Sequence, residues 1–223
     1  MRIGIIGAGA MAQTLAQHAL KAGHEVMLSN SRAPESLSAI VEAFKCYSGT
    51  AEQAAEYGDV VIIAVPLYAY NRLPKEQLKG KIVLDLLNYF PHRDGRVAPL
   101  HDSDITTSEL LASYLTGSRV VKAFNSITVQ DLASDARSIG ASDRRAIPIA
   151  SNDEEAKTTV AKLINEFGFD AANGGNLADS WRFERFRPAY CVAANKQTLE
   201  KILATTNRDT VVSDGHWIHN RYV

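Results

Sequence analysis

The sequence predicts an α/β fold in which helices cover both faces of a doubly wound, mainly parallel sheet. Short apolar runs alternate with helical patterns along residues 1–150, and this alternation is typical of parallel strands joined by helices. A run such as Val-Val-Ile-Ile-Ala-Val at 60–65 indicates a strand that is buried on both faces. We expect strands at 2–6, 25–29, 60–65, 81–84, 119–124 and 145–150.

A Gly-rich turn directly follows the first expected strand. The sequence Gly-Ala-Gly-Ala-Met-Ala at 7–12 leads into a helical pattern that continues to Lys21. In such a turn the first glycine lets the chain bend sharply, the second lets the backbone approach a phosphate, and the third position packs the helix on the sheet. Free N–H groups at the start of the helix attract an anion. Because the strand at 25–29 completes a β-α-β unit, the pattern predicts a dinucleotide site at Gly7, Gly9, Ala10, Met11 and Ala12.

The residues after the second expected strand indicate which dinucleotide is bound. A site for NAD usually has an Asp or Glu about 20 residues beyond the glycines, but this chain has Ser29-Asn30-Ser31-Arg32 there. A neutral Asn30, the Ser31 hydroxyl and the Arg32 guanidinium suit an additional phosphate on the ribose. These residues also precede an expected helix at 35–44, where Ser or Asn commonly acts as a cap, and the two roles are compatible. We therefore expect NADP, and not NAD, as the cofactor.

Further candidate residues stand where later strands are expected to end. The carboxyl ends of parallel strands meet at one edge of the sheet, where ligands bind. A proline at position 66 is as typical of the end of a strand as of a binding site. Asn125 and Ser126 can hydrogen-bond a ligand or cap the helix expected near Val129. We expect additional cofactor contacts from Val65, Pro66, Tyr68, Asn88 and Asn125.

Two segments rich in aromatic and cationic residues are candidates for a second ligand site. The loop at 88–103 is long enough to be a functional lid, although a polar surface loop has the same composition. At 181–187, arginines alternate with Trp181 and two phenylalanines, which suits an acidic aromatic ligand, a subunit contact or a solvated basic turn. The substrate contacts that we expect are Asn125, Ser126, Tyr89 and Trp181.

Composition and charge disfavour several classes of protein. A chain of 223 residues that is 46% hydrophobic can bury the core of one large domain, and we expect an NADP-binding part at 1–150 and an extension at 151–223 that closes the same domain. A formal charge of −1 offers no basic surface for nucleic acid or an anionic membrane. Cys46 and Cys191 have no metal or redox spacing, so we assign no metal. With a strand expected from Arg2 and no apolar run near the ~20 residues of a membrane span, we expect a cytoplasmic protein.

Four motifs together resemble one protein family. They are Gly-Ala-Gly-Ala-Met-Ala at 7–12, Ser-Asn-Ser-Arg at 29–32, Ala-Val-Pro at 64–66 and Val-Val-Lys-Ala-Phe-Asn-Ser-Ile at 120–127. In this order they resemble the NADP oxidoreductases that depend on coenzyme F(420), a deazaflavin, and the related reductase domain of the Steap metalloreductases. The resemblance implies a Rossmann-like fold, NADPH as cofactor, a homodimer, and direct hydride transfer between the nicotinamide C4 and a flat acceptor such as a deazaflavin or flavin.

The chain departs from this family where the acceptor should bind. Archaeal members have a His-Thr pair in place of Asn125-Ser126, and they have a long apolar helix that packs a dimer in place of the stretch 180–188. The resemblance therefore implies the cofactor more closely than it implies the acceptor.

The residues leave two other functions open. Reductases of imines or small carbonyl compounds begin with a similar NADPH-binding turn, but they need a long helical C-terminal domain, and Gly-Gly at 174–175 interrupts the last part of this chain. A non-catalytic NADP-sensing protein would need an interaction surface that the composition does not indicate. Hydride transfer between two cofactor rings needs little acid or base help from the protein, so we assign no catalytic side chain.

Overall fold

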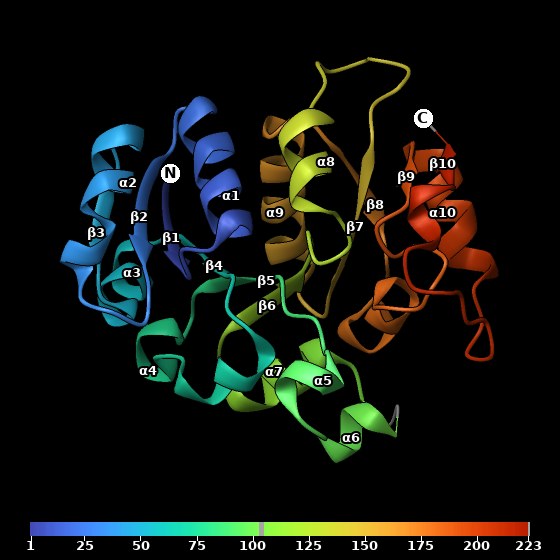
Figure 1. Ribbon diagram of the computed structural model, residues 1–223, viewed down its shortest axis with the longest axis horizontal. Coiled ribbons are helices and arrows are strands. Elements are labelled where there is room, and N and C mark those ends of the chain that lie inside the picture. Colours follow the sequence, from blue (N-terminus) through green and yellow to red (C-terminus); the bar gives the residue numbers. More distant parts are fainter. Residues whose placement is uncertain (103–104, 223) are drawn as a thin grey trace.

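One large sheet organises the computed structural model, which describes residues 1–102 and 105–222. Eight strands follow the order β3-β2-β1-β4-β5-β6-β7-β8 (Figure 1). They are β1 (Arg2–Ile6), β2 (Glu25–Ser29), β3 (Tyr47–Gly49), β4 (Val60–Ile63), β5 (Ile82–Asp85), β6 (Arg119–Lys122), β7 (Ala146–Ser151) and β8 (Asp170–Asn173). A small separate sheet pairs β9 (Ala193–Ala194) with β10 (Arg221–Tyr222).

Helices connect the strands and cover the sheet. The α-helices are α1 (Ala10–Lys21), α2 (Ser38–Phe44), α3 (Ala51–Tyr57), α4 (Lys75–Leu78), α5 (Pro91–Asp94), α6 (Ala98–His101), α7 (Thr107–Tyr114), α8 (Val129–Ser134), α9 (Glu154–Glu166) and α10 (Lys196–Thr205). Four 3₁₀ turns are η1 (Pro34–Leu37), η2 (Leu67–Arg72), η3 (Leu177–Phe183) and η4 (His216–Ile218).

The direction of the strands confirms the predicted doubly wound, mainly parallel sheet. Strands β1 to β6 all run parallel to one another. The chain passes from β1 to β2 and β3 on one side and then crosses to β4, β5 and β6 on the other. Strand β7 runs antiparallel to β6, and β8 runs parallel to β7. The carboxyl ends of β1 to β6 therefore share one edge of the sheet, which is where a ligand is expected.

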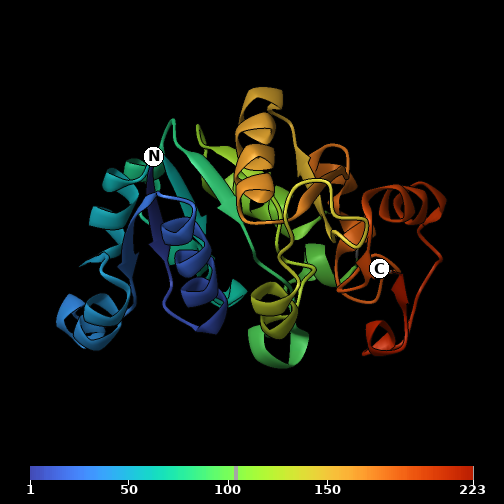
Figure 2. The ribbon, with the colours of Figure 1, turned by 90° about the horizontal axis from the view of Figure 1, so that it is seen from above.

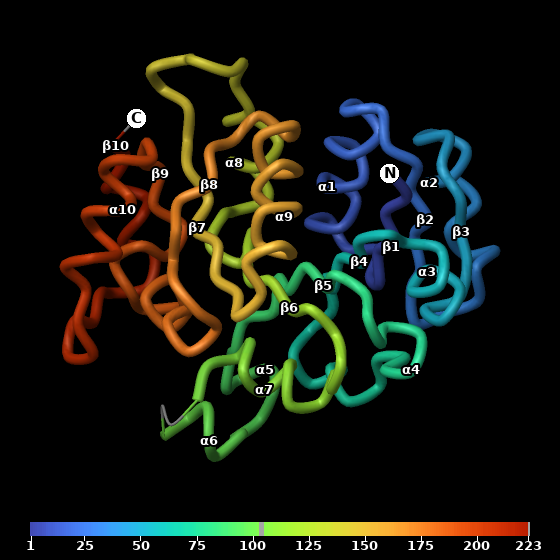
Figure 3. Tube along the Cα trace, turned by 180° about the vertical axis from the view of Figure 1, so that it is seen from behind, coloured from blue at the N-terminus to red at the C-terminus, as the bar shows by residue number. Residues whose placement is uncertain are grey.

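Alternate residues of each central strand pack on opposite faces of the sheet. In β4, Ile62 belongs to a core formed with α1, α8 and α9, whereas Ile63 belongs to a second core formed with α3, α4 and α7. Figures 2 and 3 show these helices distributed over the two faces. The near-continuous apolar run of β4 thus reflects burial on both sides, as its sequence predicts.

Some elements differ from the sequence-based expectations. The strand expected at 60–65 ends at Ile63, because the chain turns there toward η2, and the helix expected at 35–44 is divided into η1 and α2. Strand β3 was missed, since three residues are too few to produce a periodic pattern. The run at 145–150 forms β7, which runs antiparallel to β6. The sequence does not indicate this direction, because a fully buried strand has the same apolar pattern in either direction.

The C-terminal residues continue the same sheet. The boundary expected between residues 150 and 151 falls just before the last residue of β7. Strand β7 pairs with β6 of the preceding part. Strand β8 extends the sheet, and β7, β8 and α10 share a third apolar cluster with Phe183. Among the helices of the described residues, none is long and apolar enough to cross a membrane.

A buried ion pair joins the carboxyl ends of β5 and β6. Asp85 and Lys122 are register partners and are the last residues of these strands. The Lys122 Nζ lies 3.4 Å from the Asp85 Oδ2, and both side chains are fully buried. Removing one charge of such a pair leaves the other buried and uncompensated, which is costly.

Hydrogen bonds extend this pair toward two other segments. The Ser108 hydroxyl donates to the Asp85 Oδ2 at 2.6 Å, and the Lys122 ammonium donates to the Thr107 hydroxyl at 2.8 Å. Thr107 in turn donates from its backbone N–H and its hydroxyl to Glu184 at 2.9 and 2.7 Å. The network therefore fastens the start of α7 and the segment after η3 to the ligand edge of the sheet.

We expect Lys122→Met to lower the free energy of unfolding by about 3–5 kcal/mol, because the Asp85 carboxylate would remain buried without its partner. Urea denaturation followed by circular dichroism measures this loss. The double variant Asp85→Asn, Lys122→Met should recover most of it, because no unpaired charge remains. A Lys122→Met protein within about 1 kcal/mol of the parent would show that the pair does not govern stability.

Candidate active site

The carboxyl ends of β1, β2 and β4 border a cleft of about 430 Å³. Its volume lies within the range of small-molecule and cofactor sites. The predicted cofactor residues that line it are Gly7, Gly9, Asn30, Ser31, Val65, Pro66 and Tyr68. The structure thus brings together residues from three separate segments that the sequence assigns to one ligand.

The two glycines of the turn have different physical roles. Gly7 has φ of +122°, and a Cβ there would lie 2.3 Å from the Ala64 carbonyl oxygen. A Cβ at Gly9 would meet no protein atom within 4 Å. Gly7 is therefore required by the protein itself, whereas the open space at Gly9 is the space that a phosphate needs beside the backbone.

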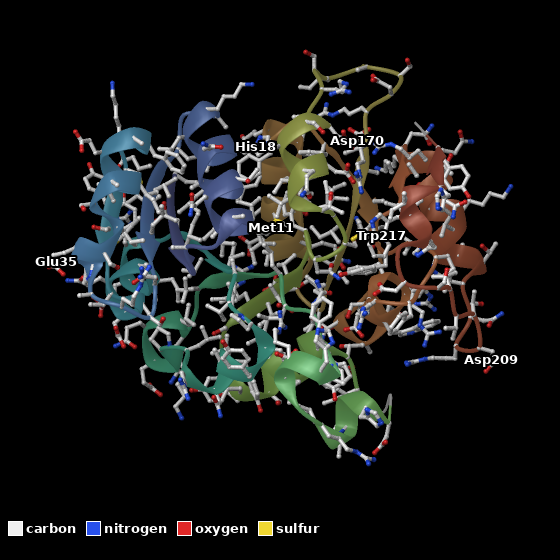
Figure 4. All side chains as sticks on the ribbon, in the orientation of Figure 1. Met11, His18, Glu35, Asp170, Asp209 and Trp217 are labelled. Carbon is white, nitrogen blue, oxygen red and sulfur yellow. The ribbon has the colours of Figure 1, made fainter. Side chains whose placement is uncertain are left out.

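The other residues of the predicted turn open helix α1. Ala12 is fully buried in the core, as expected for the position that packs the helix on the sheet. Met11, labelled in Figure 4, is partly buried against the same core, and Ala10 is exposed at the first helical position. None of these three residues lines the cleft, whereas Gly9, the N-cap of α1, does.

The turn after β2 is shaped by Asn30. Its Oδ1 accepts from the Arg32 N–H at 2.9 Å, and its amide donates to the Ser36 hydroxyl at 2.9 Å. The alternative role as a helix cap does not apply, because Ala33 is the N-cap of η1. Arg32 is exposed and follows Ser31, which lines the cleft. Within residues 1–102 and 105–222, the Arg32 guanidinium makes no ion pair.

One cationic residue of this cleft, Arg72, has no sequence signature. Arg72, the last residue of η2, lines it together with Tyr68, Ala69 and Leu73. The side chain of Tyr68 is 53% exposed. No motif in the sequence indicates Arg72, because only the 3₁₀ turn after β4 brings it back to the cleft.

Asn125 and Ser126 are buried, and Asn88 is partly buried. Asn125 and Ser126 are each 3% exposed. The Asn88 amide donates to the Asn125 carbonyl oxygen at 2.8 Å, and the Asn125 amide donates to the Phe183 carbonyl oxygen at 3.0 Å. The expected cap of α8 is instead Thr128. These residues connect segments behind the ligand edge and do not line the cleft.

A second cleft, of about 330 Å³, is lined by the other two predicted substrate residues, Tyr89 and Trp181. Tyr89 donates from its hydroxyl to the Gly95 carbonyl oxygen at 3.0 Å, and Trp181 is 8% exposed. One side of the wall is formed by residues after η3 and near residue 210: Glu184, Arg185, Phe186, Arg187, Arg208 and Val211. The rest is formed by Pro91, Leu100, His101 and Ile105.

The segment around α5 touches elements of both clefts. The Tyr68 N–H is 3.4 Å from the Asp94 Oδ1 that accepts from it, and the Arg185 guanidinium lies 5.0 Å from the centre of the Phe90 ring. Tyr68 lines the first cleft and Tyr89 and Trp181 line the second, whereas Asn125 lines neither. The loop expected at 88–103 reaches Ser103, which lies outside the described residues.

The described part of the chain holds no cluster of three or more His, Cys, Asp or Glu side chains that could bind a metal ion. Cys46 and Cys191 are both buried. Burial raises the pKa of Cys191 to about 12, so its thiol stays protonated at neutral pH and is a poor nucleophile.

Comparison with known proteins identifies relatives of this chain. Residues 2–89 match the family described as NADP oxidoreductase coenzyme F420-dependent. Metalloreductase STEAP3 of Rattus norvegicus is 29% identical over 185 residues, which cover 82% of this chain and 36% of that protein. Metalloreductase STEAP2 of Homo sapiens is 27% identical over 187 residues, which cover 82% of this chain and 35% of that protein. The chain thus spans about a third of the length of these relatives.

Solved structures share the fold. A hypothetical protein from Sinorhizobium meliloti has a TM-score of 0.75 and 30% identity, covering 88% of this chain and 95% of that one. A putative F420-dependent NADP-reductase from Arthrobacter has a TM-score of 0.68 and 22% identity, covering 82% and 87%. An imine reductase from Aspergillus terreus in complex with NADPH4 has a TM-score of 0.58 and 20% identity, covering 80% and 56%. The last two likenesses concern the fold.

We expect Gly9→Val to abolish binding of NADPH while the protein stays folded, because the new side chain would fill only the space beside the backbone. Calorimetry measures the affinity, and thermal unfolding checks the fold. Gly7→Val is the matched comparison and should destabilise the protein, since its Cβ would clash with the Ala64 carbonyl. Undiminished NADPH affinity in folded Gly9→Val protein would place the ligand elsewhere.

Proposed function

We propose that this chain is an NADP-dependent oxidoreductase that transfers a hydride between NADPH and a flat redox-active acceptor. Its residues 2–89 match the family described as NADP oxidoreductase coenzyme F420-dependent, and Metalloreductase STEAP3 is among its relatives. The acceptor class that we propose is a deazaflavin or flavin. In such a reaction the C4–H bond of the nicotinamide breaks, its hydride forms a new bond to the acceptor ring, and NADP⁺ is left.

The cleft at Gly9 is the observation that carries this proposal. Its open space lies at the first β-α turn, where a dinucleotide pyrophosphate meets the N–H groups of α1. Val65, Pro66 and Tyr68 continue the same cleft from the end of β4. A dinucleotide laid along this edge has its nicotinamide end directed toward the later strands, β5 and β6.

The second cleft supports an acceptor that is flat. Tyr89, Trp181 and Phe186 all contribute to its wall, and aromatic side chains bind planar rings by stacking. In a reaction between two cofactor rings, the protein contributes mainly distance and orientation. The buried hydrogen bonds of Asn125 to the segments at 88 and 183 suit this role, because they fix the position of both segments.

The small-substrate alternative has less support. The imine reductase from Aspergillus terreus has the same fold, but this chain covers 56% of it. At 20% identity this likeness concerns the fold alone and carries no substrate.

We expect Arg32→Ala to narrow the preference for NADPH over NADH by roughly tenfold or more, because a charge-assisted contact to the ribose phosphate would be lost. Calorimetric titration of both nucleotides measures the preference. Lys21→Ala, at the far end of α1, is the control and should leave the preference unchanged. Equal affinities for NADPH and NADH in the parent protein would contradict the assignment of NADP.

Anaerobic turnover tests the acceptor class. Purified protein is mixed with NADPH and, separately, with a deazaflavin, FMN, a quinone and a cyclic imine, while the nicotinamide absorbance is followed. We expect oxidation of NADPH by the deazaflavin or FMN and little by the imine. Oxidation by the imine alone, or by none of these compounds, would overturn the proposal.

A further inference from the structure

The second cleft has more positive charge than its own acidic residues neutralise. Three arginines and one glutamate are among its lining residues. Glu184 is engaged by the N–H and the hydroxyl of Thr107, and Arg185 pairs with Asp214 at 2.6 Å. In the part of the chain that the structure describes, Arg187 and Arg208 form no ion pair with a carboxylate.

These two arginines are held close together. The Arg187 guanidinium donates to the carbonyl oxygens of Arg208 and Thr210, at 2.7 and 2.6 Å. Burial and the nearby charge of Arg208 lower the pKa of Arg187. Like charges at short range repel each other, so an anion bound between the two guanidinium groups would be stabilised by both.

An aromatic surface lies directly beside this charge. The guanidinium carbons of Arg208 and Arg187 are 4.4 and 5.1 Å from the centre of the Trp181 ring. The same cleft is lined by Phe186, which is 40% exposed, and by Tyr89. Figure 4 labels Asp209, the residue after Arg208, in the loop after α10. Because Trp181 is 8% exposed and its ring is contacted by these guanidinium groups, the aromatic surface open to a ligand is mainly that of Phe186. The cleft places this surface beside a site for an anion.

We propose that this cleft recognises a ligand in which a flat aromatic ring carries a phosphate or carboxylate group, with the anionic group held by Arg187 and Arg208. The inference rests on the proposed function, because the ligand is taken to be the hydride acceptor. It goes beyond that function by assigning the acceptor's charge to two arginines outside residues 2–89. The ring lies on the side of Trp181 and Tyr89, toward the α5 segment that touches the dinucleotide cleft.

FMN and riboflavin are suitable probes, because they have the same ring and differ by one phosphate. Calorimetry without NADP(H) gives the affinity of each for the parent protein. We expect FMN to bind at least roughly tenfold more tightly than riboflavin, since charge-assisted hydrogen bonds to a phosphate are among the strong ones. Trp181 fluorescence gives an independent reading in a Trp217→Phe background, because the chain has two tryptophans.

Arg208 is the better residue to change, because Arg187 also donates to two carbonyl groups that shape the loop. We expect Arg208→Gln to remove most of the preference for FMN, and Arg208→Lys to keep part of it. Arg137→Gln removes an equally positive charge that pairs with Asp143 on a distant loop, and it should leave the preference unchanged. NADPH affinity should stay at the parent value in all three variants, which shows that the dinucleotide cleft is intact.

Equal affinity for FMN and riboflavin, or absence of binding by both, would overturn the inference. A preference that survives Arg208→Gln, or that is lost equally in Arg137→Gln, would also overturn it. These results are distinct from a failure of the proposed function, which is absence of hydride transfer. Binding is measured without NADPH, so a protein that selects FMN but transfers no hydride would retain the anion site and contradict only the reaction.

Discussion

The buried ion pair between Asp85 and Lys122 is the constraint on which the ligand edge depends. It fixes the carboxyl ends of two neighbouring parallel strands, and its hydrogen bonds continue through Thr107 to Glu184. Because Glu184 lines the second cleft, a charge in the core of the sheet is connected to the wall of a surface site. The pair therefore links the stability of the fold to the shape of the place where the proposed acceptor binds.

The reversal of β7 explains how the C-terminal residues reach this edge. Strands β1 to β6 supply the dinucleotide-binding order of a doubly wound sheet, whereas β7 and β8 run the other way. The chain then returns through η3, whose Leu177 carbonyl accepts from the Thr106 hydroxyl at 3.0 Å. This contact with the start of α7 brings Trp181 and the arginines after it to the second cleft. The extension thus adds a second binding surface to a sheet that already has one.

Much of the first cleft could be predicted from the sequence, because its features are local. A Gly-rich turn between a strand and a helix has one geometry, and Gly7, Gly9 and Ala12 occupy the positions that this geometry requires. Arg72 could not be predicted, since its place depends on a 3₁₀ turn with no sequence signature. The direction of β7 could not be predicted either, because an apolar run does not indicate whether a strand is parallel or antiparallel to its neighbour.

The residues of the second cleft were predicted only in part, since Asn125 and Ser126 do not line it. Tyr89 and Trp181 line the second cleft, and Tyr68 lines the first. Asn125 is buried and lines neither cleft. Sequence reasoning placed every strand end at a common edge, but it could not tell which side chains point outward there. Hydrogen bonds between distant residues, such as Asn88 and Asn125, decide that question.

Transfer of deuterium from C4-labelled NADPH tests the central claim most directly. A deazaflavin is the right acceptor, because the hydride it receives is attached to carbon and does not exchange with water. With C4-deuterated NADPH of the transferred face in ordinary water, the account predicts one deuterium on the reduced deazaflavin, found by mass spectrometry. Two results would contradict direct hydride transfer by this protein. One is reduced deazaflavin without deuterium from NADPH labelled on either face of C4, and the other is no reduction of the deazaflavin at all.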